Sequence, residues 1–272
     1  MSIQPIRVSG QKDPVMSLLR ELLQERGRQK RGLFLAEGEE LAARAFDYGG
    51  RVHILVLTEA LIASGMAAAL TARAANFGTQ VFAATSGLLG KVLQTRPAPE
   101  CAAVVERTVV RLPDVFSSER VLAVMVEHGE NADNLGMLLR SADAAGVSGA
   151  VLAADTVDPF CRRAVRASRG AVFTVPISIA REPARVIEEA RRFGLRTIAT
   201  SARGDVLYTD IDFTGPTLLV FGNEHVGISE VVREMADAVV CIPMLGRVNS
   251  LNIAAAASVV LYEAVRQRIG QK

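Results

Sequence analysis

Apolar residues in the second half of the chain fall into short continuous runs that alternate with amphipathic stretches. Such runs are typical of strands that are buried on both faces, and amphipathic stretches are typical of the helices that cover them. The predicted strands are 121–127, 150–154, 172–176, 196–200, 217–221 and 238–243, and the predicted helices are 135–145, 160–168 and 184–193, with one more helix after each of the last two strands. This alternation predicts an α/β fold with a mostly parallel sheet.

The first half has a less regular pattern. Leucine and valine recur at helical spacing from Val15 to Leu23 and are followed by basic residues, which predicts one amphipathic helix over 13–31. The other predicted helices are 37–48, 61–75 and 86–94, and the predicted strands are 33–36, 52–57, 81–83 and 102–106. Proline and polar residues at 111–114 interrupt the pattern. We therefore predict two domains, a smaller α/β domain over 1–110 and a larger one over 111–272.

Composition restricts the class of protein. Of the 272 residues 50% are apolar, but the longest apolar run, 253–261, is shorter than the roughly 20 residues that span a bilayer. The N-terminus has no cationic segment before an apolar stretch, so no secretory signal is expected. Cys101, Cys161 and Cys241 are odd in number and far apart, which argues against disulfides and a metal site. We expect a cytoplasmic protein without a membrane span or a metal.

Two turns near the C-terminus are the candidate ligand site. Each follows a predicted buried strand and precedes a helix, and ligands of open α/β sheets lie at the carboxyl ends of strands. Gly222–Ser229 has the glycine spacing of a phosphate-binding loop, but Ile228 stands where that loop has its lysine. No G-x-G-x-x-G follows a predicted strand. These observations argue against a nucleoside triphosphatase and a dinucleotide-binding enzyme.

Three ordered motifs resemble those of a known family. They are Asn131-x-x-Asn134-x-Gly136-x-x-x-Arg140-x-Ala142-x-x-x-Gly146, Gly222-x-Glu224-x-x-Gly227-Ile228-Ser229 and Ile242-Pro243-Met244-x-Gly246-x-x-x-Ser250-Leu251-Asn252. In this order they resemble the motifs of the SpoU (TrmH) family of RNA ribose 2′-O-methyltransferases, in the SPOUT class. Ser168-x-Gly170-Ala171-x-Phe173 is also similar to a family signature. The first half resembles the L30e-like substrate-binding extension of members that act on rRNA.

The resemblance implies a fold, a cofactor and an assembly. The fold would be a parallel α/β sheet whose C-terminal segment forms a deep trefoil knot, an exception to the usual absence of knots. The cofactor would be S-adenosylmethionine, and the protein would be a homodimer with active sites near the interface. By the matching motifs, the cofactor site would involve Thr200, Gly222, Ile242 and Leu251. The catalytic arginine would be Arg140, surrounded by Asn131, Glu224, Ser250 and Asn252.

The residue types are compatible with this chemistry. Methyl transfer from a sulfonium to a hydroxyl is an in-line displacement, which depends mainly on positioning and on removal of the hydroxyl proton. Gly222, Gly227 and Gly246 let the backbone approach a flat ligand. A guanidinium with a pKa above about 12 is a poor base. We therefore expect Arg140 to orient the ribose and its phosphate and to stabilise the developing alkoxide.

Each motif residue also has a structural explanation when it is taken alone. Asn131, Asn134 and Ser250 could cap helices, Glu224 could cap the helix that begins near Ser229, and Arg140 could be a surface arginine. The conjunction of three ordered motifs at strand ends favours the functional interpretation. A further cluster at helical spacing, which is either a solvated face or a stripe that contacts RNA phosphates, comprises Arg162, Arg163, Arg166 and Arg169.

The sequence therefore predicts an enzyme that methylates a ribose 2′-hydroxyl in structured RNA. rRNA is favoured over tRNA because of the L30e-like extension. The alternatives are a tRNA ribose methyltransferase and a non-catalytic RNA-binding or ribosome-assembly protein on the same fold. The methylated nucleotide is not specified by these motifs, nor is the choice between naked RNA and a ribosomal particle.

Overall fold

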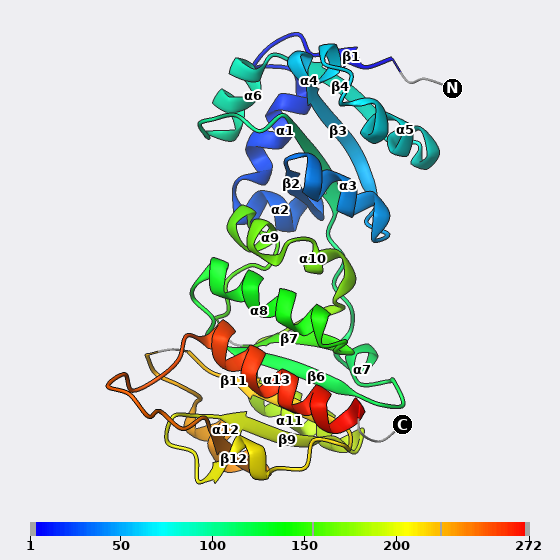
Figure 1. Cartoon of the computed structure of the whole chain (residues 1–272). Helices are drawn as coiled ribbons and strands as arrows, with labels where there is room; N and C mark the ends of the chain where they lie inside the picture. Colours follow the sequence, from blue (N-terminus) through cyan, green and yellow to red (C-terminus); the bar gives the residue numbers. More distant parts are fainter. Residues whose placement is uncertain (1–3, 154, 224, 270–272) are drawn as a thin grey trace. The chain divides into compact units, whose positions relative to one another are not determined.

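The computed structural model describes residues 4–153, 155–223 and 225–269. The described chain divides into two compact units (Figure 1). Unit 1 runs to Thr108 and also includes Phe160–Thr174, and unit 2 contains Val109–Pro159 and the chain from Val175 onward. The predicted domains, 1–110 and 111–272, stay a prediction, and residues 160–174 are the segment on which the two divisions differ most.

Unit 1 is built on a mixed sheet with strand order β1-β4-β3-β5-β2. β5 is antiparallel to both of its neighbours, and the other pairs are parallel. The strands are β1 (Ile6–Arg7), β2 (Leu33–Glu37), β3 (Val52–Thr58), β4 (Gln80–Ala84) and β5 (Cys101–Glu106). The helices are α1 (Pro14–Leu22), α2 (Glu25–Arg31), α3 (Glu39–Asp47), α4 (Glu59–Ala63), α5 (Ala68–Phe77), α6 (Ser86–Leu93), α9 (Arg162–Ser168) and α10 (Ala171–Thr174). This unit is the smaller α/β part that the sequence predicts.

The single helix predicted over 13–31 is wrong, because the chain turns between α1 and α2. A Cβ on Gly27 would lie 2.0 Å from the carbonyl oxygen of Glu21, so only glycine allows α2 to approach the end of α1 this closely. The Arg28 guanidinium, only 4% exposed, donates to the carbonyl oxygens of Leu22 and Leu23, at 3.0 Å each. Carbonyls at a helix end lack partners within the helix, and Arg28 satisfies them.

The single helix predicted over 61–75 is also wrong, since α4 ends at Ala63 and α5 begins at Ala68. Gly65 has a φ of +77°, which is a left-handed conformation that favours glycine. The Ser64 hydroxyl accepts the backbone N–H of Met66 and so competes with the helical pattern. The alanine-rich spacing on either side hides this turn.

The segment Phe160–Thr174 packs within unit 1 although its sequence lies between two strands of unit 2. The Phe160 and Phe173 rings lie 5.0 and 5.9 Å from the Phe34 ring of β2, between ring centroids. The Arg107 guanidinium carbon lies 4.9 Å from the centroid of the Phe160 ring. The strand predicted over 172–176 is therefore wrong: this apolar stretch is the short helix α10, and the strand follows at 177–180. Short apolar runs do not distinguish the two structures by periodicity.

Unit 2 is built on a seven-stranded sheet in which every pair of neighbours is parallel, with the order β10-β12-β9-β11-β6-β7-β8. The strands are β6 (Leu122–Glu127), β7 (Gly149–Ala153), β8 (Ile177–Ala180), β9 (Arg196–Thr200), β10 (Val206–Leu207), β11 (Thr217–Phe221) and β12 (Ala238–Cys241). The helices are α7 (Leu112–Val115), α8 (Ala132–Ala144), α11 (Pro183–Arg192), the 3₁₀ turn η1 (Tyr208–Asp210), α12 (Glu230–Met235) and α13 (Ile253–Ile269). The predicted mostly parallel α/β fold is confirmed.

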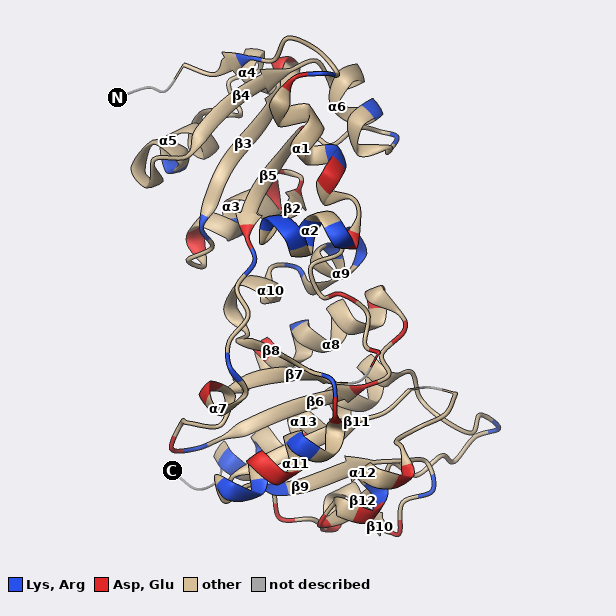
Figure 2. Ribbon diagram, turned by 180° about the vertical axis from the view of Figure 1, so that it is seen from behind, with Lys and Arg blue, Asp and Glu red and all other residues tan. Residues whose placement is uncertain are grey.

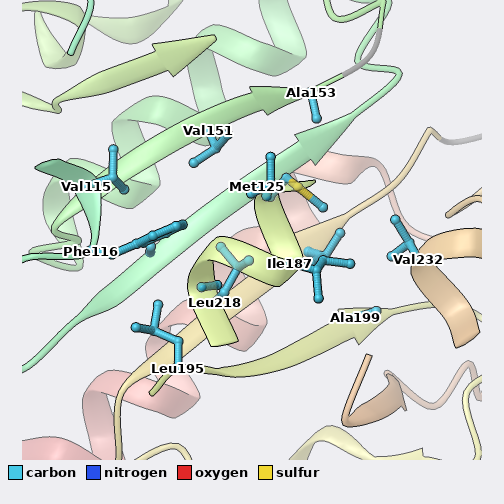
Figure 3. Close-up of a cluster of buried hydrophobic side chains, with 14 of the residues drawn as sticks. Val115, Phe116, Met125, Val151, Ala153, Ile187, Leu195, Ala199, Leu218 and Val232 are labelled. Carbon is cyan, nitrogen blue, oxygen red and sulfur yellow. The ribbon is translucent and has the colours of Figure 1, made fainter. Parts of the chain in front are cut away.

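The core of unit 2 explains the continuous apolar runs. Every residue of β6 and β11 is buried. In Figure 3, Met125 of β6 and Leu218 of β11 lie near Ile187 of α11, in the cluster that covers one side of the sheet. Two further helices, α8 and α13, pack against each other. The hydroxyl oxygens of Ser141 in α8 and Ser258 in α13 lie 2.7 Å apart. Because the strands are parallel, the turns after β6, β9, β11 and β12 all leave the same edge of the sheet.

Two further expectations concern topology and membranes. The threading that would make a trefoil knot of the C-terminal segment stays a prediction. Within residues 4–269, positions 154 and 224 set aside, none of the helices combines the length and apolar character needed to cross a bilayer.

Candidate functional site

A cavity of about 400 Å³ lies at the carboxyl ends of β9, β11 and β12 in unit 2. Small-molecule sites in proteins usually measure about 300 to 1,000 Å³ and combine apolar walls with a few polar groups. Its apolar lining includes Phe221, Val240 and Ile253, and its polar lining comes from the turns that follow the strands. The cavity brings together all four predicted cofactor residues, Thr200, Gly222, Ile242 and Leu251, and also Ser250.

The turn after β11 closes on itself next to Gly222. A Cβ on Gly222 would lie 2.2 Å from the carbonyl carbon of Gly227 and 2.4 Å from the backbone nitrogen of Ile228. The turn is held by a pair of hydrogen bonds, from the Asn223 N–H to the Gly227 oxygen at 3.1 Å and from the Gly227 N–H to the Asn223 oxygen at 2.8 Å. Gly227 itself has a φ of +78°. The glycines at these two positions are therefore required by the shape of the turn.

Two buried polar side chains hold this turn against the end of β6. Asn223, 4% exposed, donates to the His128 carbonyl oxygen at 3.0 Å and accepts the backbone N–H of His225 at 2.7 Å. Glu127, 1% exposed, accepts the backbone N–H of Ser229 at 2.9 Å, and Ser229 caps α12. Neither Asn223 nor Glu127 was predicted as a site residue. The signal that could have identified Glu127 is an acidic residue that ends a fully apolar strand.

The turn after β12 is linked to α8 by a pair of asparagines. The Asn252 side-chain amide donates to the Asn134 side-chain oxygen at 2.9 Å, and the Asn252 oxygen accepts the backbone N–H of Ala254 at the start of α13. In the sequence Asn134 belongs to the first motif and is a candidate helix cap, but it was not predicted as a site residue. Its contact with Asn252, across 118 positions of sequence, places it beside a predicted catalytic residue.

Asn131 lies at the N-cap of α8 and Arg140 lies within α8, and neither lines the cavity at the strand ends. The Asn131 side chain caps α8 by accepting the backbone N–H groups of Asp133 and Asn134, at 2.9 and 3.2 Å. Arg140 is exposed, and within the described part of the chain its side chain makes no hydrogen bond or ion pair. Asn131 and Asn134 border a small hollow, and Ile253 lines both this hollow and the cavity at the strand ends. Asn134 and Asn252 thus connect α8 to the cavity.

Not every predicted site residue is placed by the structure. Glu224 lies outside the described residues. Ser250 is exposed and lines the cavity, but no hydrogen bond of its side chain is found among the residues described.

The four arginines predicted to contact RNA belong to unit 1 and differ in their surroundings. Arg162 forms an ion pair with Glu37 and donates to the Leu93 carbonyl oxygen at 2.7 Å. Arg169, in a left-handed conformation after α9, pairs with Glu40 at 2.9 Å. Arg163 and Arg166 are exposed and border a hollow of about 280 Å³ beside β2 and α9. Figure 2 shows further basic residues along α2, which packs on β2 as α9 does.

Comparisons with known proteins agree with both halves of the chain. Residues 121–262 match the model of the SpoU rRNA Methylase family, and residues 14–103 match that of the MRM3-like substrate binding domain. A Streptomyces viridochromogenes protein named 23S rRNA (uridine(2479)-2'-O)-methyltransferase is 36% identical over 89% of this chain and 85% of its own. A Bacillus subtilis protein named 23S rRNA (guanosine(2553)-2'-O)-methyltransferase RlmP is 28% identical over 89% of this chain and 92% of its own.

A solved structure extends the similarity to three dimensions. The AdoMet-bound rRNA methyltransferase from Sinorhizobium meliloti has a TM-score of 0.85 with this chain and 31% sequence identity, over 96% of this chain and 97% of that one. The family suggested by the three motifs is therefore confirmed. The chain belongs to the SpoU rRNA methylase family.

Proposed function

We propose that the protein methylates a ribose 2′-hydroxyl of ribosomal RNA, with S-adenosylmethionine as the methyl donor. The observation that carries this proposal is the cavity at the ends of β9, β11 and β12, which gathers the residues predicted for the cofactor in a chain of the SpoU rRNA methylase family. Its shape fits the cofactor, because apolar walls suit an adenine ring and Gly222 removes a side chain where the backbone must approach a ligand.

The chain's own residues position the reacting groups. When bound, S-adenosylmethionine supplies an electrophilic methyl group on a sulfonium. Arg140 orients the ribose and its phosphate and stabilises the negative charge that develops on the 2′-oxygen, since a guanidinium stays protonated and binds oxyanions. Asn252, held by Asn134, aligns the ribose with the cavity. Ser250 and Asn131 complete this set, together with Glu224, which lies outside the described residues.

Ribosomal RNA is the proposed substrate because of unit 1. Two of the curated relatives that match most of this chain are named as 23S rRNA 2′-O-methyltransferases, one for a uridine and one for a guanosine. The exposed Arg163 and Arg166, with the basic residues of α2, give unit 1 a surface suited to RNA phosphates. Ribosomal RNA as substrate also supports a cytoplasmic location.

We further propose that the protein acts as a homodimer. Apolar side chains are exposed on the two packed helices, with Met137 of α8 at 42% and Tyr262 of α13 at 51%, and in the turn after β12, with Leu245 at 98%. Exposed apolar residues near a site mark interaction surfaces. Light scattering on the purified chain should give about twice the monomer mass of 29.0 kDa. A monomer mass would contradict this part of the proposal, and Met137→Asp should shift the protein toward that mass.

The test of the function is transfer of labelled methyl groups from S-adenosylmethionine to unmodified rRNA and tRNA in separate reactions, followed by nucleoside analysis. We expect label in a 2′-O-methylnucleoside from rRNA. Label in a nucleoside from tRNA alone would contradict rRNA as the substrate. Failure to bind the cofactor and to label naked RNA or ribosomal subunits would favour a non-catalytic RNA-binding protein.

A further inference from the structure

Two arginines line the cofactor cavity. Arg203 lies in the turn after β9, and Arg233 lies on α12. Among the described residues neither makes an ion pair, and no Asp or Glu lines the cavity. Arginine is protonated at neutral pH and presents several N–H donors in a fixed geometry. This wall therefore offers positive charge and hydrogen-bond donors to a ligand.

The turn that carries Arg203 is held rigidly against β12. The Ser201 N–H donates to the Val240 oxygen at 3.0 Å, and the Asp205 N–H donates to the Val239 oxygen at 3.1 Å. A Cβ on Gly204 would lie 2.5 Å from the carbonyl carbon of Val240, so the approach requires glycine. These contacts hold the turn against β12.

One hydroxyl organises both arginines. The Ser201 Oγ accepts the backbone N–H of Arg203 and a guanidinium N–H of Arg233, each at 3.2 Å. The bond from Arg233 fixes one edge of its guanidinium and leaves other N–H donors for the cavity. The backbone of Arg203 and the guanidinium of Arg233 therefore meet at one hydroxyl, and both residues line the cavity, an arrangement that suits an anion bound there.

We propose that Arg203 and Arg233, organised by Ser201, form the subsite for the carboxylate of the cofactor. The inference rests on the proposed function and deepens it. S-adenosylmethionine has an apolar adenine, a cationic sulfonium and an amino-acid end, and the carboxylate is its anionic group. The cavity has the matching division, with apolar side chains such as Phe221 and Ile242 along one part and Ser201 with the two arginines along another. Guanidinium–carboxylate pairs are strong and directional.

The test compares two ligands that differ in the amino-acid end. S-adenosylhomocysteine has the carboxylate, and 5′-methylthioadenosine keeps the adenosine and the thioether but lacks it. We expect Arg233→Ala to weaken the binding of S-adenosylhomocysteine by about tenfold or more, as measured by titration calorimetry. The affinity for 5′-methylthioadenosine should be unchanged. Arg233→Lys should recover part of the loss, because it keeps the charge but not the fork of donors. Arg203→Ala should show the same selectivity.

The control is Arg192→Ala, which removes an exposed arginine of α11 that pairs with Glu189 and does not line the cavity. It should leave both affinities unchanged. Equal losses for the two ligands, or no loss for either, would overturn the inference. A raised KM for RNA with unchanged S-adenosylhomocysteine affinity would assign the arginines to an RNA phosphate instead. If the wild-type protein bound neither ligand, the proposed function would fail and this inference with it.

Discussion

Gly222→Ala tests whether the shape of the turn after β11 makes the cofactor cavity. The added Cβ would lie 2.2 to 2.4 Å from three backbone atoms of Gly227 and Ile228, and backbone cannot move aside as a flexible side chain can. Opening the turn breaks the two hydrogen bonds between Asn223 and Gly227, which cost about 0.5–1.5 kcal/mol each. Steric strain adds about 1–3 kcal/mol. A loss of about 2.8 kcal/mol corresponds to a hundredfold weaker affinity.

The assay is titration calorimetry with S-adenosylhomocysteine, accompanied by thermal unfolding to verify that the variant is folded. Gly215→Ala is the matched control, because Gly215 lies before β11, at the opposite end of the strand, and a Cβ there meets no atom within 4 Å. We expect Gly222→Ala to lose roughly a hundredfold in affinity and Gly215→Ala to lose little. Wild-type affinity in Gly222→Ala, or an equal loss in Gly215→Ala, would refute the steric reasoning.

Three further predictions concern stability and RNA binding. Glu127→Ala should lower the free energy of unfolding by about 1–3 kcal/mol, since it leaves the Ser229 N–H without its acceptor. Glu127→Gln should lower the free energy of unfolding by less, because the amide oxygen can still accept this bond. Equal midpoints of urea unfolding for the two variants would argue against this role of Glu127. Hydrogen bonds led by the one from Arg266 lower the pKa of Glu263 from 4.5 to about 2, so its stabilisation is present above pH 4.5 and is lost as the pH falls toward 2. The difference in unfolding temperature between wild type and Glu263→Gln should shrink over that interval, and a constant difference would contradict the assignment. Arg166→Ala should weaken RNA binding and should reduce, by about 0.7–0.9, the slope of the logarithm of the RNA-binding constant against the logarithm of the salt concentration. An unchanged slope would show that Arg166 does not contact a phosphate.

Five of the seven strands of unit 2 could be predicted closely because their signal is local, whereas β8 was misplaced and β10 was missed. The predicted strands 196–200 and 217–221 have the same bounds as β9 and β11. A strand buried on both faces must be apolar along its whole length, and glycine or proline marks its end. Three of the four residues proposed for the cofactor, Thr200, Gly222 and Ile242, end or directly follow these strands, but they were identified by the resemblance to the family motifs and not by the strand pattern.

The parts that escaped prediction depend on contacts between distant residues. The break after α1 depends on the close approach of Gly27 to Glu21 and on the partners of Arg28, none of which appears in the helical spacing. The segment 160–174 joins unit 1 because Phe160 and Phe173 pack on Phe34, more than a hundred residues earlier.

The candidate site shows the same limit. The pattern marked Asn134 as a cap, but its bond to Asn252 exists only after the turn after β12 has folded next to α8. Glu127 and Asn223 were overlooked because a buried polar residue acquires its role from the backbone groups it satisfies. Sequence motifs therefore locate the site, and the structure supplies the residues that hold it in shape.

Cofactor binding and methyl transfer are proposed to depend on different groups, the cavity for the first and Arg140 for the second. The most direct measurement is the affinity of Arg140→Ala for S-adenosylhomocysteine together with its single-turnover rate of methyl transfer to rRNA. We predict near wild-type affinity and a rate reduced by about a hundredfold or more, the scale of losing one oxyanion-stabilising group. A rate comparable to that of the wild type would contradict the account.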